Sequence, residues 1–337
     1  MAGIGTMCDR DHAPARGAPP TKGHTVDTSR LPGPVAALAP AAVLHVPHAS
    51  TAIPPDVRRR IRLTDAALQR QLHLMTDWFT GELFALPPEA AVAVRFPVSR
   101  LVVDPERFLD DDREVMAARG MGVIYTRTSD GEELRRPPTA AQRAALISRY
   151  YRPHHAALEA AVEAALASHG RCLVVDCHTF PSRPLPCDLD RRTPRPDICL
   201  GTDPFHTPAW LVDLARQRFA AAGFTVDVDR PFSGALVPAG FHERNASVSA
   251  LMIEVGRRLY MNEGSGEKTP EFEAVRAALR GIVLSLVRAV KNGHGRDPIC
   301  RGLAAESSTE HADGPVDVTV SSRPGLPHCA SLSPSAR

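Results

Sequence analysis

The sequence lacks the marks of several protein classes. No apolar run approaches the roughly 18 residues of a membrane-spanning helix. The first residues mix glycine, alanine, proline and charge, so they do not form the apolar core of a secretory signal. The seven cysteines show no CxxC pair and no spacing typical of a disulfide framework. We therefore expect a cytoplasmic protein with reduced thiols and no membrane partner.

An excess of charge of one sign is also absent. The chain has 40 lysine and arginine residues against 38 aspartate and glutamate residues. This balance gives no sign of a nucleic-acid partner or of a lipid surface, and we expect neither. The oligomeric state is left open by the sequence.

Several familiar catalytic motifs are missing as well. The glycines form neither a GxGxxG fingerprint nor a Walker loop, and no GxSxG elbow is present. A serine hydrolase therefore finds little support. Cys177 beside His178 is a poor thiol nucleophile, because adjacent residues of a strand point to opposite faces of the sheet.

The two ends of the chain differ in composition from its middle. Residues 1–38 are rich in proline, glycine and alanine, and residues 293–337 in glycine, serine and proline, both without periodicity. We predict a disordered leader and a disordered tail. Residues 39–292 then form a single domain.

Within that domain, apolar strand patterns alternate with helical patterns, which predicts an α/β sheet covered on both faces. The helix predicted after Thr64 has apolar residues at helical spacing as far as Phe84 and includes Asp77. A second helix is predicted over 139–169, and Pro153 is expected to break or kink it. The predicted strands are 41–46, 91–96, 172–176, 198–200, 224–228 and 250–255, with strand-like segments at 99–107 and 122–126. The other predicted helices are 207–222 and 269–291.

Three apolar segments lead into ionisable residues, at His48, His178 and Glu254. Ligands bind at the carboxyl ends of strands in open α/β sheets, which is where the two histidines are expected. A carboxylate inside Leu-Met-Ile-Glu-Val is costly to bury unless it is paired or bound to a metal, and burial raises its pKa toward the range of a general base. Alternatively, Glu254 pairs with Arg257 or Arg258, and the histidines are ordinary core or loop residues.

The combination favours a metal site. Two histidines and a carboxylate such as Asp77, with a further glutamate nearby, have the composition of a catalytic zinc site with an open position for water. Zinc lowers the pKa of its water, and the glutamate takes the proton.

Two arginines flank an aspartate in Arg100-x-x-x-Asp104-x-x-Arg107. Each guanidinium offers a fork that matches a carboxylate, so the segment suits an anionic substrate. The alternative is an Arg–Asp–Arg network on the surface.

Together these motifs resemble the N-formylglutamate amidohydrolase family. The motifs occur in the family's order: 46–50, Asp77, 99–107, 176–179, 230–234 and 253–261. The resemblance implies a fold similar to that of the zinc carboxypeptidases and aspartoacylases, in which a mixed, mostly parallel twisted sheet lies between helix layers in three layers (αβα).

The resemblance also implies roles for single residues. His48 and His178 would be ligands of one zinc ion per chain, with Asp77 as the third ligand by position. Glu254 would be the general base. Arg100 and Arg107 would bind substrate carboxylates or polarise the scissile carbonyl, and Arg100 is also expected to be catalytic. Asp104 and Arg257 would be further substrate-binding residues.

The implied reaction is the hydrolysis of N-formyl-L-glutamate, a small anionic N-acyl amino acid, to formate and L-glutamate in histidine breakdown. Where the family often has asparagine before the second arginine, this chain has Glu106. One alternative is a related zinc amidohydrolase or carboxypeptidase-like enzyme that acts on another N-acyl amino acid or a short peptide. The proline-rich loop after His178 would reshape the pocket for such a substrate. Another alternative is a non-catalytic small-anion-binding protein. Asp176, on the same face as His178, is expected to orient a ligand, and Cys177 to point away.

Overall fold

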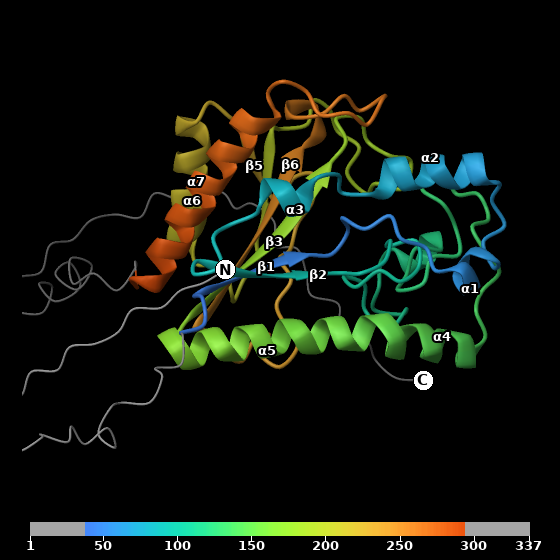
Figure 1. The fold of residues 1–337 in the computed structure, drawn as a ribbon, viewed down its shortest axis with the longest axis horizontal. Coiled ribbons are helices and arrows are strands. Elements are labelled where there is room, and N and C mark those ends of the chain that lie inside the picture. Colours follow the sequence, from blue (N-terminus) through green and yellow to red (C-terminus); the bar gives the residue numbers. More distant parts are fainter. Residues whose placement is uncertain (1–37, 294–337) are drawn as a thin grey trace, which may run out of the picture. The chain divides into compact units, whose positions relative to one another are not determined.

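A six-stranded sheet forms the centre of the part of the chain that the computed structural model describes, residues 38–293 (Figure 1). The strand order is β2-β1-β3-β6-β4-β5. The first four strands in this order are parallel, β4 runs antiparallel to β6, and β5 is parallel to β4. The strands are β1 (Ala42–Val46), β2 (Ala91–Arg95), β3 (Cys172–Phe180), β4 (Ile198–Gly201), β5 (Val226–Val228) and β6 (Val248–Gly256). This confirms the predicted mixed, mostly parallel sheet.

Helices cover both faces of the sheet, and side-chain alternation along the strands decides which face each residue meets. Val43, Val174 and Ala250 pack with α5 (Arg152–His169). The neighbouring residues Leu44 and Leu173 face the opposite layer. That layer contains α3 (Thr80–Leu83), α6 (Ala209–Ala221) and α7 (Phe272–Lys291). The predicted three-layer αβα arrangement is therefore correct.

A second apolar cluster lies mostly among the helices and loops that precede α5, and Cys187 and Leu185 of a later loop pack into it. It joins α2 (Asp65–Met75) to the segments 96–103 and 116–134. Thr64 caps α2, since its side chain accepts a hydrogen bond from the amide of Ala67. The remaining helices are α1 (Pro55–Arg58), α4 (Ala140–Leu146), a π-helical turn (Ile147–Tyr151) and two 3-10 turns (Ala117–Arg119 and Arg257–Leu259).

Three of the predicted elements are corrected by the structure. The helix after Thr64 ends at Met75, so Asp77 lies in a loop and its amide donates to the carbonyl of His48. Phe79 then adopts a left-handed backbone conformation (φ 61°) before α3 begins. The segments 99–107 and 122–126 are loops and turns rather than strands. Their apolar residues fill the second cluster without a neighbouring strand to pair with.

The helix predicted over 139–169 forms with an irregular turn in its middle. Thr139 and Gln142 make a capping box at its start. The π-helical turn at Ile147–Tyr151 lies immediately before Pro153, which has no N–H to donate to the helical ladder. The predicted break at this proline is therefore present as a π-helical turn.

Other expectations meet the structure only in part. Four cysteines, Cys172, Cys177, Cys187 and Cys199, are free and buried, as expected of reduced thiols, while Cys8, Cys300 and Cys329 lie outside the described residues. None of the helices within residues 38–293 is long and apolar enough to cross a membrane. The predicted leader and tail lie outside the described residues, apart from one residue of each.

Two valines in the sheet test this packing. Val174 is fully buried in β3, whereas Val92 on the edge strand β2 is 38% exposed. Val174→Ala should lower the free energy of unfolding by about 2 kcal/mol or more, because it removes buried methyl groups and leaves a cavity. Val92→Ala should cost less than about 1 kcal/mol, as measured by urea denaturation. Equal losses would contradict the assigned burial.

Candidate active site

Four ionisable side chains of the central strands lie on the face of the sheet that meets α5. His45 stands opposite Asp176 in the β1–β3 register, and His178 stands opposite Glu254 in the β3–β6 register. All four are buried. Cys177 faces the other layer, among the apolar residues that pack with α6 and α7, as predicted. The face is thus apolar along the first half of β3 and polar toward its carboxyl end.

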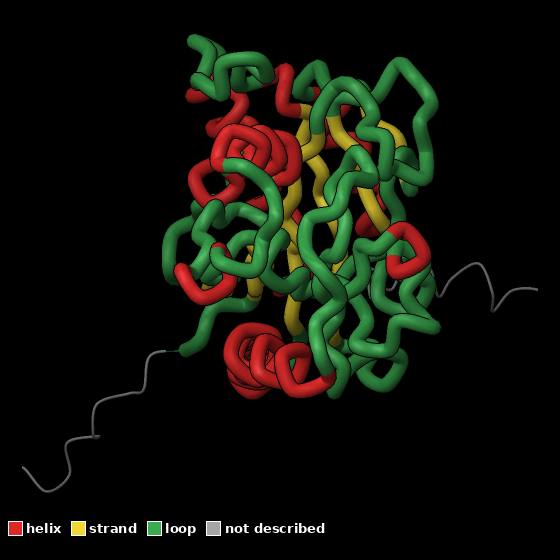
Figure 2. Tube along the Cα trace, turned by 90° about the vertical axis from the view of Figure 1, so that its right-hand side faces the viewer, coloured by secondary structure: helices red, strands yellow, loops and turns green. Residues whose placement is uncertain are grey.

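Loops bring further polar side chains to the same place. His48 follows β1 and Asp77 follows α2, and the hydrogen bond of 3.0 Å from the Asp77 amide to the His48 carbonyl fixes the two loops to one another. Asp104 and Glu106 come from the loop after β2. Figure 2 looks at the side of the domain where these connecting loops gather.

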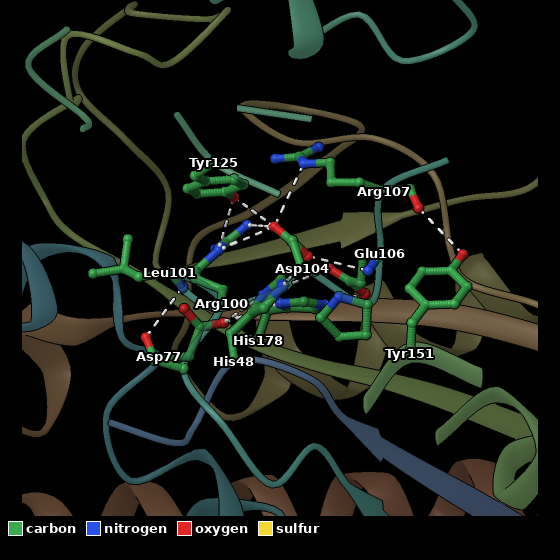
Figure 3. A network of polar contacts seen from close by, with 12 residues as sticks. His48, Asp77, Arg100, Leu101, Asp104, Glu106, Arg107, Tyr125, Tyr151 and His178 are labelled. Atoms are coloured by element: carbon green, nitrogen blue, oxygen red, sulfur yellow. Dashed lines mark hydrogen bonds and ion pairs between the residues drawn. The ribbon is translucent and has the colours of Figure 1, made fainter. Parts of the chain in front are cut away.

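His48, Asp77 and His178 form a buried group of possible metal ligands (Figure 3). One donor atom from each lies within 4.8 Å of the others. Asp77 Oδ2 is 3.0 Å from His178 Nδ1 and 3.8 Å from His48 Nδ1. The His48 Nδ1 atom is buried and has no hydrogen-bond partner among the described residues.

The opposite nitrogen of each histidine is held by a carboxylate. His48 Nε2 lies 2.8 Å from Asp104 Oδ1. His178 Nε2 lies 3.1 Å from Asp176 Oδ1 and 3.0 Å from Glu106 Oε1. An imidazole that donates from Nε2 has its lone pair on Nδ1, which is the form that binds a metal. The prediction that Asp176 orients His178 is therefore supported by a direct contact.

Two other groups of possible ligands are less suited to a metal. They are His45, Glu106 and Asp176, and His48, Asp104 and Glu106. Each of these groups has one histidine where the first group has two, and its histidine nitrogen lies 2.8 Å from a carboxylate oxygen. Within residues 38–293, the buried imidazole nitrogen without a hydrogen-bond partner is Nδ1 of His48, which faces Asp77 of the first group.

The carboxylates of the group are held in their charged form. Burial opposes the charge of Asp77, but the hydrogen bond from His178 and the nearby His48 outweigh it and lower the pKa of Asp77 to about 2. Burial also opposes the charge of Asp104, but the positive charges of Arg100, His48 and Arg107 outweigh this effect. The pKa of Asp104 therefore lies well below its usual range. Charged carboxylates suit both metal binding and the orientation of the histidines.

Glu254 differs from these acids. Burial raises its pKa to about 8, and the nearby Asp77 and Glu106 add to the rise while His178 opposes it. Its Oε2 atom is buried and has no hydrogen-bond partner among the described residues. A carboxyl group with these properties can accept and return a proton near neutral pH.

A cavity of about 930 Å³ opens over these residues. It is lined by the three possible metal ligands and Glu254, and by Arg100, Arg107 and Arg257 of the predicted substrate-binding residues. Arg257 donates to the carbonyl of Leu74 at 2.9 Å and lies 3.6 Å from Asp77 Oδ1.

Asp104, the fourth predicted substrate-binding residue, does not line the cavity. Its side chain is fully buried, with Arg100 Nη2 at 2.9 Å and the hydroxyl of Tyr125 at 2.5 Å. Arg107 Nε approaches to 3.5 Å (Figure 3). The oxygens of Asp104 face protein groups rather than open space, and its role in binding substrate stays a prediction.

Sequence reasoning missed some members of this network. His45 Nδ1 lies 2.8 Å from Asp176 Oδ1, and His45 Nε2 lies 2.9 Å from His154 Nε2. Burial lowers the pKa of His154 to about 2, so this imidazole is neutral. Glu254 was indicated by its position as an ionisable residue inside an apolar run. His45 shows the same signal, because it lies inside the apolar run 42–46. Nothing in the helix around His154 or in the loop around Tyr125 indicated their contacts.

Comparisons with known proteins agree with this geometry. The family model described as FGase, N-formylglutamate amidohydrolase, matches residues 41–261. The crystal structure of an N-formylglutamate amidohydrolase from Ralstonia eutropha JMP134 is 25% identical, with a TM-score of 0.65, over 76% of this chain and 95% of that chain. The gene product Atu2144 from Agrobacterium tumefaciens shares the fold at 21% identity and a TM-score of 0.55, over 77% of this chain and 94% of that chain. A search of curated proteins gives no significant match.

The buried network can be tested against a surface ion pair. Asp104→Asn removes the charge that pairs with Arg100 and should lower the free energy of unfolding by about 3 kcal/mol or more, because a buried cation loses its partner. Glu133→Gln acts on the exposed pair with Arg62 and should cost less than about 1 kcal/mol. Urea denaturation of both variants at neutral pH gives the comparison. Similar costs would show that Asp104 is not the buried partner described.

Proposed function

The chain belongs to the N-formylglutamate amidohydrolase family and is an amidohydrolase. From this premise we propose that it hydrolyses the amide bond of N-formyl-L-glutamate. Water adds to the formyl carbon, the C–N bond breaks, and formate and L-glutamate leave. The observation that carries the proposal is the joint position of three possible metal ligands and the buried acid Glu254 around one cavity.

We infer that His48, Asp77 and His178 hold one zinc ion. The residues fit this metal, because two imidazole nitrogens and one carboxylate oxygen are a common donor set of catalytic zinc. The buried Nδ1 of His48 has no partner among the described residues, and a metal would satisfy it. When bound, zinc supplies a Lewis acid that lowers the pKa of water toward ~7. Asp104 and Asp176 keep the two imidazoles in the form that binds it.

Glu254 is assigned as the general base. Glu254 lines the cavity and has a buried oxygen without a hydrogen-bond partner among the described residues, and its raised pKa lets it take a proton from the attacking water and deliver it to the leaving nitrogen. Burial keeps competing water away from the carboxyl group and strengthens its interactions.

The arginines are assigned to the substrate. Arg100 and Arg107 are fixed by the buried Asp104 beneath them, with side chains 15% and 22% exposed. Their guanidinium groups carry the positive charge that substrate carboxylates or a developing oxyanion need. Arg257 lies beside Asp77, where it steadies that ligand or contacts the substrate.

The first test is the reaction itself. Purified protein should contain about one zinc ion per chain and release formate from N-formyl-L-glutamate. A chelator should abolish the activity, and added zinc should restore it, because zinc supplies the Lewis acid that the proposed reaction needs. Formate and metal are both measured directly. Protein that neither contains nor binds zinc would refute the metal proposal.

The second test concerns Glu254. Glu254→Gln keeps the shape of the side chain but cannot take a proton, so kcat should fall at least about 100-fold while zinc remains bound. The exposed Glu133→Gln serves as a matched control and should keep full activity. Undiminished turnover in Glu254→Gln would overturn the assignment.

A further inference from the structure

The catalytic cavity is larger than formylglutamate requires. Its volume of about 930 Å³ lies near the upper end of the roughly 300–1,000 Å³ that accommodates drug-sized ligands. A formyl group is the smallest possible acyl group and reaches little beyond the scissile carbonyl. Most of the cavity would therefore be left to water if the formyl compound were the substrate best suited to it.

One wall of this cavity is apolar. It is built from two loops that are joined where Arg119 donates to the carbonyl of Cys187 at 2.7 Å. Met116 and Met121 come from the first loop, and Leu185 packs against the same apolar cluster from the second. We call the apolar lining side chains of these loops the apolar wall; they are Val115, Met116, Met121, Leu185 and Leu189. The second loop also brings Asp188, Asp190, Arg191 and Arg192 to the cavity, where Asp188 pairs with Arg195 and Asp190 with Arg192.

Two members of the apolar wall are exposed although they line a cavity. Val115 is 64% exposed and Leu189 is 60% exposed. Single exposed apolar residues are ordinary, but two of them on the two loops of one wall leave apolar surface that a ligand can cover. Methionine adds to this character, since four of the seven methionines of the chain line the cavity: Met75, Met116, Met121 and Met252. Methionine side chains adapt to apolar groups of different shape.

Charge decides which part of the substrate meets this wall. The amino-acid half of an N-acyl amino acid carries the carboxylate. Three of the cavity's cations lie beside the metal-ligand group: Arg100 and Arg107 approach Asp104, the partner of His48, and Arg257 lies 3.6 Å from Asp77. The acyl half carries no charge and extends from the other side of the scissile amide. An uncharged acyl chain is therefore the complement of the apolar wall.

We infer that the apolar wall is an acyl subsite and that the enzyme acts on N-acyl amino acids with an apolar acyl chain longer than formyl. The inference rests on the proposed amide hydrolysis and deepens it. The same bond breaks: water adds to the acyl carbon, and a fatty acid leaves in place of formate with the free amino acid.

A series of N-acyl-L-glutamates tests the subsite on the zinc-loaded enzyme. We expect kcat/KM to rise from formyl through butanoyl to octanoyl, by at least about tenfold overall. Each methylene that becomes fully buried can raise kcat/KM by up to about fourfold. Leu189→Ser and Val115→Ser should lower the ratio of octanoyl to formyl kcat/KM at least about threefold. Val92→Ser, which alters an exposed valine on β2, is the matched control and should leave both values unchanged.

The outcomes separate this inference from the proposed function. Hydrolysis of the formyl compound with no gain from longer chains, or a ratio that the two variants do not change, overturns the subsite and leaves the proposed reaction standing. Hydrolysis of octanoyl-glutamate alone supports the subsite and refutes formylglutamate as the substrate. If neither compound is hydrolysed, calorimetric titration with N-octanoyl-L-glutamate decides, and binding no tighter than that of N-formyl-L-glutamate overturns the subsite.

Discussion

The site depends on one constraint: a charge buried beneath the cavity needs a partner of opposite charge within a few ångströms. Asp104 shows this most clearly. Its carboxylate is fully buried, and it is shared by His48, Arg100 and the hydroxyl of Tyr125. The loop after β2 must therefore pass close to the loop after β1, because no other position of Asp104 would satisfy these groups. The same pairing gives the cavity a fixed, charged floor.

This constraint also sets the direction of the possible metal ligands. With Nε2 of His48 and of His178 occupied by carboxylates, Nδ1 of each ring faces Asp77. His45 and His154 extend the same chain of contacts from Asp176 into α5. A network fixed at so many points loses little entropy when it binds a cation, which is the arrangement that a hydrolytic metal site requires.

The cavity combines two surfaces with different tasks. The proposed reaction assigns amide hydrolysis to the charged floor and Glu254, and the chain belongs to a family of amidohydrolases. The apolar wall offers no group for the chemical step, and the proposed acyl subsite gives it a role in the choice of substrate. Two loops form the wall, whereas the floor combines the strand residues His178 and Glu254 with loop residues such as His48, Asp77 and Asp104.

Local sequence pattern determined the six strands of the sheet, the cap at Thr64 and the opposite orientations of Cys177 and His178, because these follow from side-chain alternation and neighbouring residues. It also indicated His48, His178 and Glu254 as ionisable residues at strand ends. Only the tertiary structure placed Asp77 in a loop, buried Asp104 and joined His154 to His45. These contacts join residues 29 to 109 positions apart in the chain. They arise from strand register and loop packing, which no local pattern encodes.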